Sequence, residues 1–183
     1  TVDDSAFLAG RMRYRLGYPN REVRQSLNDV LLARLAGGRE NRALAAGRLY
    51  ERFLANDLTG VESEFRALFA GIPTDWHRRN EIARFEGYYA SVFYAALAAL
   101  GMDLTVEEAS GAGRLDLMMR FEERVYLFEF KVAERAGEGA ALRQLAERGY
   151  ADKYRAKGEP IHLVGIEFSE ATRNISGFEM ALA

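Results

Sequence analysis

The segment 110–132, with the sequence SGAGRLDLMMRFEERVYLFEFKV, constrains the fold more than any other part of the chain. Two apolar runs flank a polar turn at about 120–124, which predicts a β-hairpin. The second run is apolar at nearly every position, with Leu127, Phe128 and Phe130 among its residues. This pattern is typical of a central strand that is covered on both faces. We therefore expect a sheet with helices on both sides.

Three charged residues interrupt the apolar runs of this hairpin. Asp116 lies inside the first run, and Glu129 and Lys131 flank Phe130 in the second. Residues two apart in a strand project to the same face, so Glu129 and Lys131 point the same way. If the strands pair antiparallel about the turn, Asp116 can lie across from Glu129. Two carboxylates and an ammonium would then meet at one end of the sheet, which suits a divalent-metal site with a lysine beside it.

A structural alternative exists for the same residues. Asp116 could lie at a strand edge, and Glu129 with Lys131 could form an ordinary salt bridge on a solvated face. The apolar neighbours on both faces weaken this alternative, because buried charges are costly unless they are paired or bind a metal. The functional interpretation is therefore favoured.

Composition limits the class of protein. With 183 residues and 49% apolar content, the chain fits one domain, or one domain with a helical extension. It has no cysteine, which excludes disulfides and thiolate zinc sites and fits a reducing cytoplasm. No apolar run reaches transmembrane length, so no membrane association is expected. The chain starts with Thr1 rather than Met, and we expect it to be a fragment or a processed product.

The charge is distributed unevenly along the chain. Residues 1–80 carry thirteen arginines against ten acidic residues, whereas residues 81–183 have a net charge of −5, which gives −2 in total. Nucleic-acid binders are usually basic, so this balance gives no support to a DNA substrate. A bound cation would offset part of the acidic half.

The N-terminal region is expected to be helical, and we find no chemistry on it. Residues 1–18 are interpreted as a tail or linker. Asn20 is predicted to cap the first of three helices, and the second covers about 40–55. The third begins at Thr59, which has capping-box spacing to Glu62. The apolar faces of the three helices are expected to comprise Val23, Leu27, Val30, Leu31 and Leu35; Leu44, Tyr50, Phe53 and Leu54; and Val61, Phe65, Leu68 and Phe69.

A longer helix is predicted from about 74 to 100, ended by Gly101. Glu86 lies on its apolar face, so it is either the polar edge of that face or a site residue. Its position just before the strand pair favours the site. The apolar face comprises Ile82, Phe85, Tyr89, Phe93, Ala96, Leu97 and Leu100.

The remaining elements complete a mixed sheet. They are strands at about 103–109, 114–121 and 124–132, a helix at about 138–156, and strands at 161–168 and 174–182, the last at the sheet edge. The helix is expected to face inward with Ala141, Leu142, Leu145, Ala146 and Tyr150, with Gln144 beside that face. His162 is expected to point outward in its strand and to have a structural role.

The glycine-rich segment 110–113 connects one strand to the next. It is not followed by Gly-Lys-Ser/Thr, so no phosphate-binding loop is expected.

The order αβββαβ gives an α/β class with a mixed α+β sheet. We divide the chain into a helical region, 1–73, and a sheet domain, 74–183. Asp116, a twelve-residue gap and Glu129-Phe130-Lys131 on this core resemble the PD-(D/E)XK nuclease superfamily, whose fold is restriction-endonuclease-like.

The segments FEGYYASVFYAALAALG, GAGRLDLMM, VYLFEFKV, LRQLAERGYADKY and IHLVGIEF resemble, more narrowly, the nuclease-like domain that follows an AAA-ATPase-like domain in many bacterial proteins. That resemblance covers about 80–183. The segment YRLGYPNREVR resembles the joint after the ATPase domain. The proline that usually precedes the aspartate is absent, and Leu115 stands there.

The resemblance implies phosphodiester hydrolysis with Mg²⁺ or Mn²⁺. Asp116, Glu129 and the carbonyl of Phe130 would bind the ion, and Glu86 would bind through water or hold a second ion. Lys131 would orient or deprotonate the attacking water or stabilise charge on the phosphate. The remaining assignments are Gln144 for positioning, and Arg114, Lys153 and Tyr154 for contacts with the substrate backbone.

Three functions stay open at the level of sequence. The first is a metal-dependent nuclease acting on DNA, or on RNA, with a homodimer making double-strand cleavage easier to explain. The second is a nucleic-acid-binding module without catalysis, and the third is a protein-interaction module attached to the ATPase-like domain. Binding without metal dependence would favour the second, and large exposed apolar patches on the N-terminal helices would favour the third.

Overall fold

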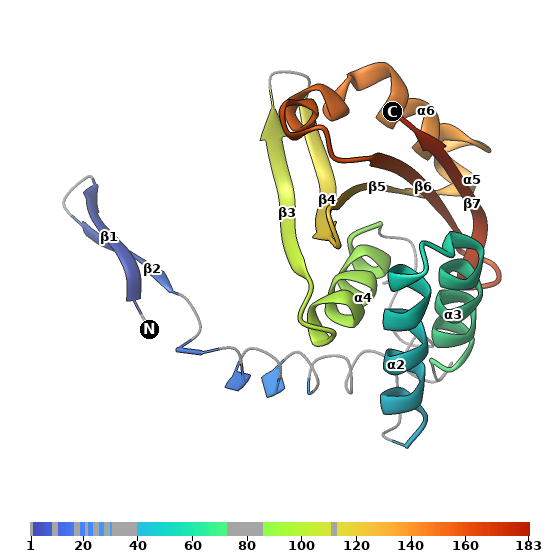
Figure 1. Ribbon diagram of the computed structural model, residues 1–183, viewed down its shortest axis with the longest axis horizontal. Helices are drawn as coiled ribbons and strands as arrows, with labels where there is room; N and C mark the ends of the chain where they lie inside the picture. The colour runs from blue at the N-terminus through green and yellow to red at the C-terminus, as the bar shows by residue number, and fades with distance from the viewer. Residues whose placement is uncertain are drawn as a thin grey trace.

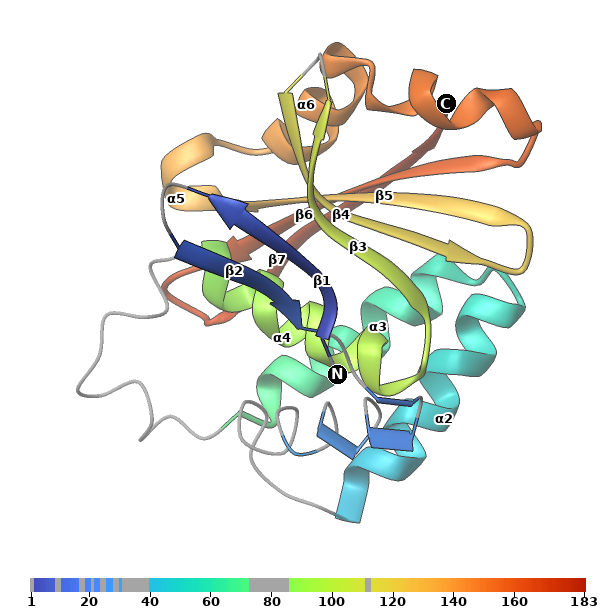
Figure 2. The same ribbon diagram turned by 90° about the vertical axis from the view of Figure 1, so that its left-hand side faces the viewer.

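The main body of the protein is a five-stranded mixed sheet with helices on both faces (Figures 1 and 2). The computed structural model describes residues 2–8, 11–16, 19–20, 22–23, 26–27, 30, 40–72, 86–110 and 113–183. No helix in these ranges has the length and apolar character needed to cross a membrane.

The sheet consists of β3 (Asp103–Ser110), β4 (Gly113–Phe121), β5 (Arg124–Val132), β6 (Ile161–Ser169) and β7 (Asn174–Leu182), in that spatial order. The neighbours β5 and β6 are parallel, and the other neighbours are antiparallel. The parallel pair needs a crossover, which the helix between β5 and β6 provides. The predicted αβββαβ order with an edge strand after it is confirmed. The elements are β1 (Val2–Leu8), β2 (Arg11–Leu16), α2 (Glu40–Leu54), α3 (Leu58–Ala70), α4 (Glu86–Ala99), β3 (Asp103–Ser110), β4 (Gly113–Phe121), β5 (Arg124–Val132), α5 (Ala133–Ala136), α6 (Ala140–Arg148), the 3₁₀ helix η3 (Tyr150–Lys157), β6 (Ile161–Ser169) and β7 (Asn174–Leu182).

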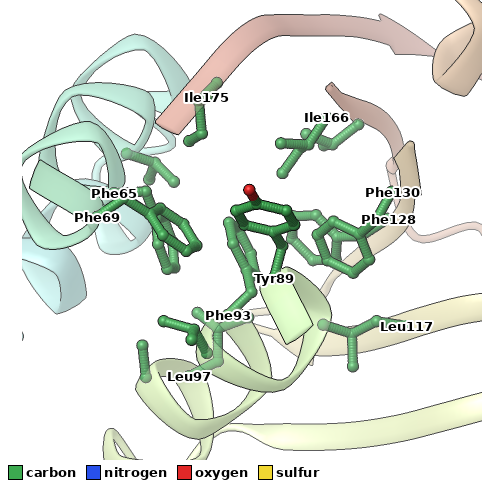
Figure 3. Close-up of a cluster of buried hydrophobic side chains, with 14 of the residues drawn as sticks. Phe65, Phe69, Tyr89, Phe93, Leu97, Leu117, Phe128, Phe130, Ile166 and Ile175 are labelled. Atoms are coloured by element: carbon green, nitrogen blue, oxygen red, sulfur yellow. The ribbon is translucent and has the colours of Figure 1, made fainter. Parts of the chain in front are cut away.

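An aromatic core fills one face of the sheet, beneath α2, α3 and α4 (Figure 3). Tyr89 stacks on Phe168 with ring centroids 4.3 Å apart, and Phe65 stacks on Phe93 at 3.6 Å. Each of these four rings is buried. Because α2 and α3 both contribute side chains to this core, they pack on the same face of the sheet as α4.

A second core lies on the opposite face, under α6 and η3. Leu127 of β5, Leu163 of β6 and Leu145 of α6 are buried in it. Since β5 contributes to both cores and is buried from Val125 to Phe130, it is the central covered strand that its composition predicted.

Gly165 allows α6 to lie directly against β6. A Cβ built on this residue would be 2.7 Å from the Cα and 2.8 Å from the Cβ of Leu142, and it would overlap the Leu142 backbone nitrogen. No side chain fits there without moving the helix. Gly165 is also in register with Glu129 on the neighbouring strand, so the helix packs tightly on the sheet beside that glutamate.

The region expected to be a tail or linker contains two strands that were not predicted. β1 and β2 form an antiparallel two-stranded hairpin. The sequence carried a signal, because basic and apolar residues alternate through 11–16 in the period of a strand. Asn20 caps as predicted, since its Oδ1 accepts a hydrogen bond from the Val23 backbone N–H at 2.9 Å. Leu31 and Leu35 lie outside the described residues.

The predicted details of α2 and α3 need two corrections. In α2, Leu49 and Phe53 are buried, whereas Tyr50 and Leu54, expected to face inward, are exposed. Leu44 lies outside the described side chains. The cap of α3 is Asp57 rather than Thr59: its Oδ1 accepts a hydrogen bond from the Gly60 N–H at 2.9 Å. Val61, Phe65 and Phe69 are buried as expected, and Leu68 is partly buried.

The helix predicted at 138–156 is two elements. α6 ends at Arg148, and Gly149 adopts a left-handed conformation with φ of 62°, after which η3 begins. A glycine in this conformation ends a helix without steric cost. Ala146, expected to face inward, is exposed. The short helix α5 was missed.

Two further expectations concern His162 and the start of the longer helix. His162 was expected to point outward, but it is buried and its ring stacks on Tyr126 with centroids 4.9 Å apart. Its packing role is the structural one that was expected. Ile82, Phe85 and the proposed domain boundary at residue 73 lie outside the described residues.

Candidate active site

The site forms where the ladder between β4 and β5 ends. The last paired residues are Leu117 and Phe128, and continuing that register places Asp116 across from Glu129. At this point Asp116 Oδ2 accepts a hydrogen bond from the backbone N–H of Phe130 at 2.9 Å. The carboxylate thus takes the place of a backbone carbonyl in the ladder, which fixes Asp116 beside β5.

Glu129 is the most deeply buried acid of this group, and its two oxygens have different surroundings. Its side chain is 1% exposed. Oε1 accepts hydrogen bonds from Lys131 Nζ at 2.9 Å and from Gln144 Nε2. Oε2 is buried and has no hydrogen-bond partner among the described residues. Buried polar atoms without a partner are rare, and Oε2 is therefore an unusual acceptor in this site.

The surroundings of Glu129 oppose its ionisation. Burial raises the pKa of this carboxyl, the charge of Asp116 raises it further, and the hydrogen bond and charge of Lys131 only partly offset them. The resulting pKa is about 7, against an ordinary value of 4.5. A cation placed at Oε2 would favour the ionised form.

Lys131 lies among three oxygens. Its Nζ is 2.9 Å from Glu129 Oε1, 3.0 Å from the carbonyl oxygen of Phe130 and 3.6 Å from Glu86 Oε2. Burial lowers the pKa of Lys131, but the hydrogen bond and charge of Glu129, with Glu86 and Asp116, outweigh burial and raise that pKa. Lys131 is therefore an ammonium at neutral pH, and the depressed pKa that a general base would need is not present in this arrangement.

The helices on the two faces supply the remaining predicted residues of the site. Glu86 is the first residue of α4, and its half-exposed carboxylate is directed to Lys131. Gln144 extends from α6 onto Glu129, and the close approach at Gly165 positions that helix. Sequence reasoning did not find Gly165, although a glycine within an otherwise apolar strand signals close packing.

The three predicted substrate contacts have different environments. Arg114 and Lys153 are exposed, and the carbonyl of Arg114 accepts a hydrogen bond from the Tyr150 hydroxyl at 2.9 Å, which joins β4 to η3. Tyr154, by contrast, is 8% exposed and packs in the second core. The Lys153 ammonium lies 5.7 Å from the centre of its ring. Arg114 and Lys153 are thus on the surface, and Tyr154 lies beneath it.

The donor chemistry fits a hard divalent cation. Asp116, Glu129 and the Phe130 carbonyl offer oxygen donors, which Mg²⁺ prefers, and Glu129 Oε2 is a buried oxygen without a partner. Within the described ranges no group of three Asp, Glu, His or Cys side chains is arranged to hold one ion. The carboxylate of Glu86 forms an ion pair with Lys131. Two carboxylates are enough for Mg²⁺, because this ion keeps several waters.

Comparison with known families supports this interpretation. Residues 84–178, which include α4, the whole hairpin and α6, match the family model described as PD-(D/E)XK nuclease superfamily. The chain belongs to the PD-(D/E)XK nuclease superfamily. Its mixed sheet with flanking helices is consistent with the restriction-endonuclease-like fold of that superfamily. Nucleases of this superfamily generally use divalent metals.

A similar protein is described only as an uncharacterized protein in the vnfD 5' region of Azotobacter chroococcum mcd 1. It is 52% identical over 178 residues, which are 97% of this chain and 34% of that protein. The chain thus spans about a third of the length of this relative. No solved structure matches the chain.

Proposed function

We propose that this chain is a metal-dependent nuclease that hydrolyses phosphodiester bonds of DNA. The observation that carries the proposal is the environment of Glu129: a buried carboxylate beside Asp116, with one oxygen bound to Lys131 and Gln144 and the other without a partner. A buried acceptor without a partner is costly, and a salt bridge made only for stability gives no reason for that cost.

Each residue can be given a role consistent with its contacts. Asp116, Glu129 and the Phe130 carbonyl hold the ion, which when bound activates water and neutralises charge on the phosphate. Lys131, as an ammonium, orients the attacking water or stabilises negative charge on the phosphate, rather than acting as a base. Gln144 holds Glu129 in its orientation.

The substrate and the partners are part of this proposal. Arg114 and Lys153 contact backbone phosphates, and buried Tyr154 supports Lys153 from below. We propose DNA rather than RNA as the substrate, a homodimer for double-strand cleavage, and an ATPase-like domain elsewhere in the full-length protein. The greater length of the Azotobacter relative leaves room for such a domain.

The test combines Mg²⁺ and Mn²⁺ calorimetry with cleavage of supercoiled plasmid. Asp116→Asn is preferred to alanine, because an amide oxygen still accepts from the Phe130 N–H while the charge is removed. We expect Asp116→Asn to bind metal weakly and not to cut, and Lys131→Ala to bind metal without cutting. The matched controls, Glu147→Gln and Lys157→Ala, change exposed residues and should cut normally.

Two results would contradict the proposal. Cleavage that Asp116→Asn leaves intact would show that the activity comes from elsewhere. A wild-type chain that binds DNA equally well with and without metal, and cuts none, would favour the binding module without catalysis. Cleavage of RNA but not DNA would correct the substrate and leave the site assignment in place.

A further inference from the structure

The contacts of Lys131 coincide with the ligands expected for a metal. Of the four oxygen sources that the sequence assigned to a divalent ion, three are in contact with the Lys131 ammonium: Glu129, the Phe130 carbonyl and Glu86. The fourth, Asp116, accepts the Phe130 N–H. One protein cation therefore lies among the oxygens that would surround the ion.

These contacts occupy the oxygens unequally. Glu129 Oε1 accepts two hydrogen bonds, from Lys131 and Gln144, which fills both of its lone-pair directions, whereas Oε2 accepts none. The Phe130 carbonyl and Glu86 contact the ammonium at 3.0 and 3.6 Å. A divalent ion bound to the Phe130 carbonyl and Glu86 would lie close to the ammonium that already contacts both groups, and two positive charges so close together repel each other.

Charge leads to the same conclusion. Asp116, Glu129 and Glu86 contribute three negative charges when ionised, and Lys131 contributes one positive charge among them. The Lys131 side chain is only 17% exposed, so water screens its charge incompletely. A divalent ion that enters while the ammonium is present meets a smaller net negative charge and a repelling neighbour.

We propose that Lys131 is the resident cation of this site, so that its ammonium and a divalent metal ion compete for the same three groups: the Glu129 carboxylate, the Phe130 carbonyl and Glu86. The inference rests on the proposed nuclease site and deepens it. Lys131 lowers metal affinity in the resting protein, and repulsion by the bound ion weakens its contacts with the Phe130 carbonyl and Glu86. The released ammonium is then free to turn towards a phosphate, which links loading of the metal to availability of the lysine.

The test measures Mn²⁺ affinity directly, without cleavage. Lys131→Met removes the charge and keeps a linear side chain of similar length. We expect it to bind Mn²⁺ about tenfold more tightly than the wild type in calorimetry. Lys157→Met is the matched control, because it removes the same charge from an exposed position at the end of η3, and its affinity should be unchanged.

A second measurement covers a variant that folds poorly without metal. Removing Lys131 leaves Glu129 buried beside Asp116 without its counter-charge, so the variant should unfold at a lower temperature than the wild type. Saturating Mn²⁺ should then raise the unfolding temperature more in Lys131→Met than in the wild type, since binding to the folded state stabilises it.

The outcomes separate the inference from the proposed function. If the wild type binds Mn²⁺ and Lys131→Met binds it equally or more weakly, the competition is wrong while the metal site stands. If neither protein binds Mn²⁺, both are wrong. If Lys131→Met binds more tightly but the wild type cuts no nucleic acid, the competition stands and the nuclease proposal fails.

Discussion

Replacing Glu129 with glutamine should make the protein more stable at alkaline pH. The folded state holds this carboxyl at a pKa of about 7, against 4.5 for the ordinary group. Because the folded pKa is the higher one, the folded state binds the proton more tightly than the unfolded state does. Stability therefore falls as the pH rises from about 4.5 to about 7, and it stays lower above that window.

The size of the effect follows from the shift. One pKa unit corresponds to about 1.36 kcal/mol, so the ionised carboxylate lowers the free energy of unfolding by about 3 kcal/mol at pH 8. Glutamine is neutral, has nearly the same shape and still offers an oxygen to Lys131 and Gln144. Glu129→Gln should recover about 3 kcal/mol at pH 8 and almost nothing at pH 4.5.

Urea unfolding at several pH values between 4.5 and 8 measures this difference, with Glu147→Gln as the exposed control that should not respond. The gap between Glu129→Gln and the wild type should also close when Mn²⁺ is added, since only the wild-type carboxylate gains from the ion. The reasoning is refuted if the variant is no more stable than the wild type at pH 8, or if wild-type stability does not change between pH 4.5 and 7.

Three further predictions concern packing, capping and metal binding. Gly165→Ala should lower the free energy of unfolding by about 1–3 kcal/mol and reduce cleavage, because the new methyl group overlaps the Leu142 backbone. Gly47→Ala is the control in urea unfolding and plasmid assays: it lies within α2, and a Cβ there meets nothing within 4 Å, so it should raise the free energy of unfolding by about 0.5–1 kcal/mol and leave cleavage unchanged. Asp57→Ala removes the cap of α3 and should lower the free energy of unfolding, measured in urea, by about 1 kcal/mol. The Mn²⁺ affinity should not change, and a change would show that α3 is coupled to the site. Mn²⁺ affinity should rise as the pH increases from 6 to 8, since Glu129 must lose its proton to bind, and a pH-independent calorimetric affinity would contradict its role as a ligand.

Local pattern was enough to predict the elements that place the site. Alternating apolar and polar residues and the apolar runs predicted the three strands of the meander and the edge strand. The two-residue separation of Glu129 and Lys131 placed their side chains on one face. The antiparallel register then placed Asp116 opposite Glu129. Strand period and hairpin pairing depend on residues close in sequence, which is why local pattern predicts them.

Features that depend on three-dimensional packing were not predictable in the same way. The hydrogen bond from Phe130 to Asp116 exists because the ladder stops there, and no residue spacing indicates where a ladder stops. Thr59 has the spacing of a capping box, but Asp57 lies two residues earlier, and its side chain accepts the hydrogen bond that caps the first turn of α3. The break at Gly149 could have been expected from the glycine, yet the apolar spacing continued through it to Tyr150.

The packing of α6 on Gly165 has a consequence for the order of folding. Asp116, Glu129 and Lys131 belong to one hairpin, whose short loop closes quickly, whereas Gln144 and Gly165 arrive only when the crossover brings β6 beside β5. We expect Glu129 to stay hydrated until then, so that its charge has no unfavourable effect on the growing sheet. Docking of the helix should remove that water in a late step. The same step would leave the buried oxygen without a partner, so we expect any affinity of the site for a cation to appear only when the domain is nearly complete.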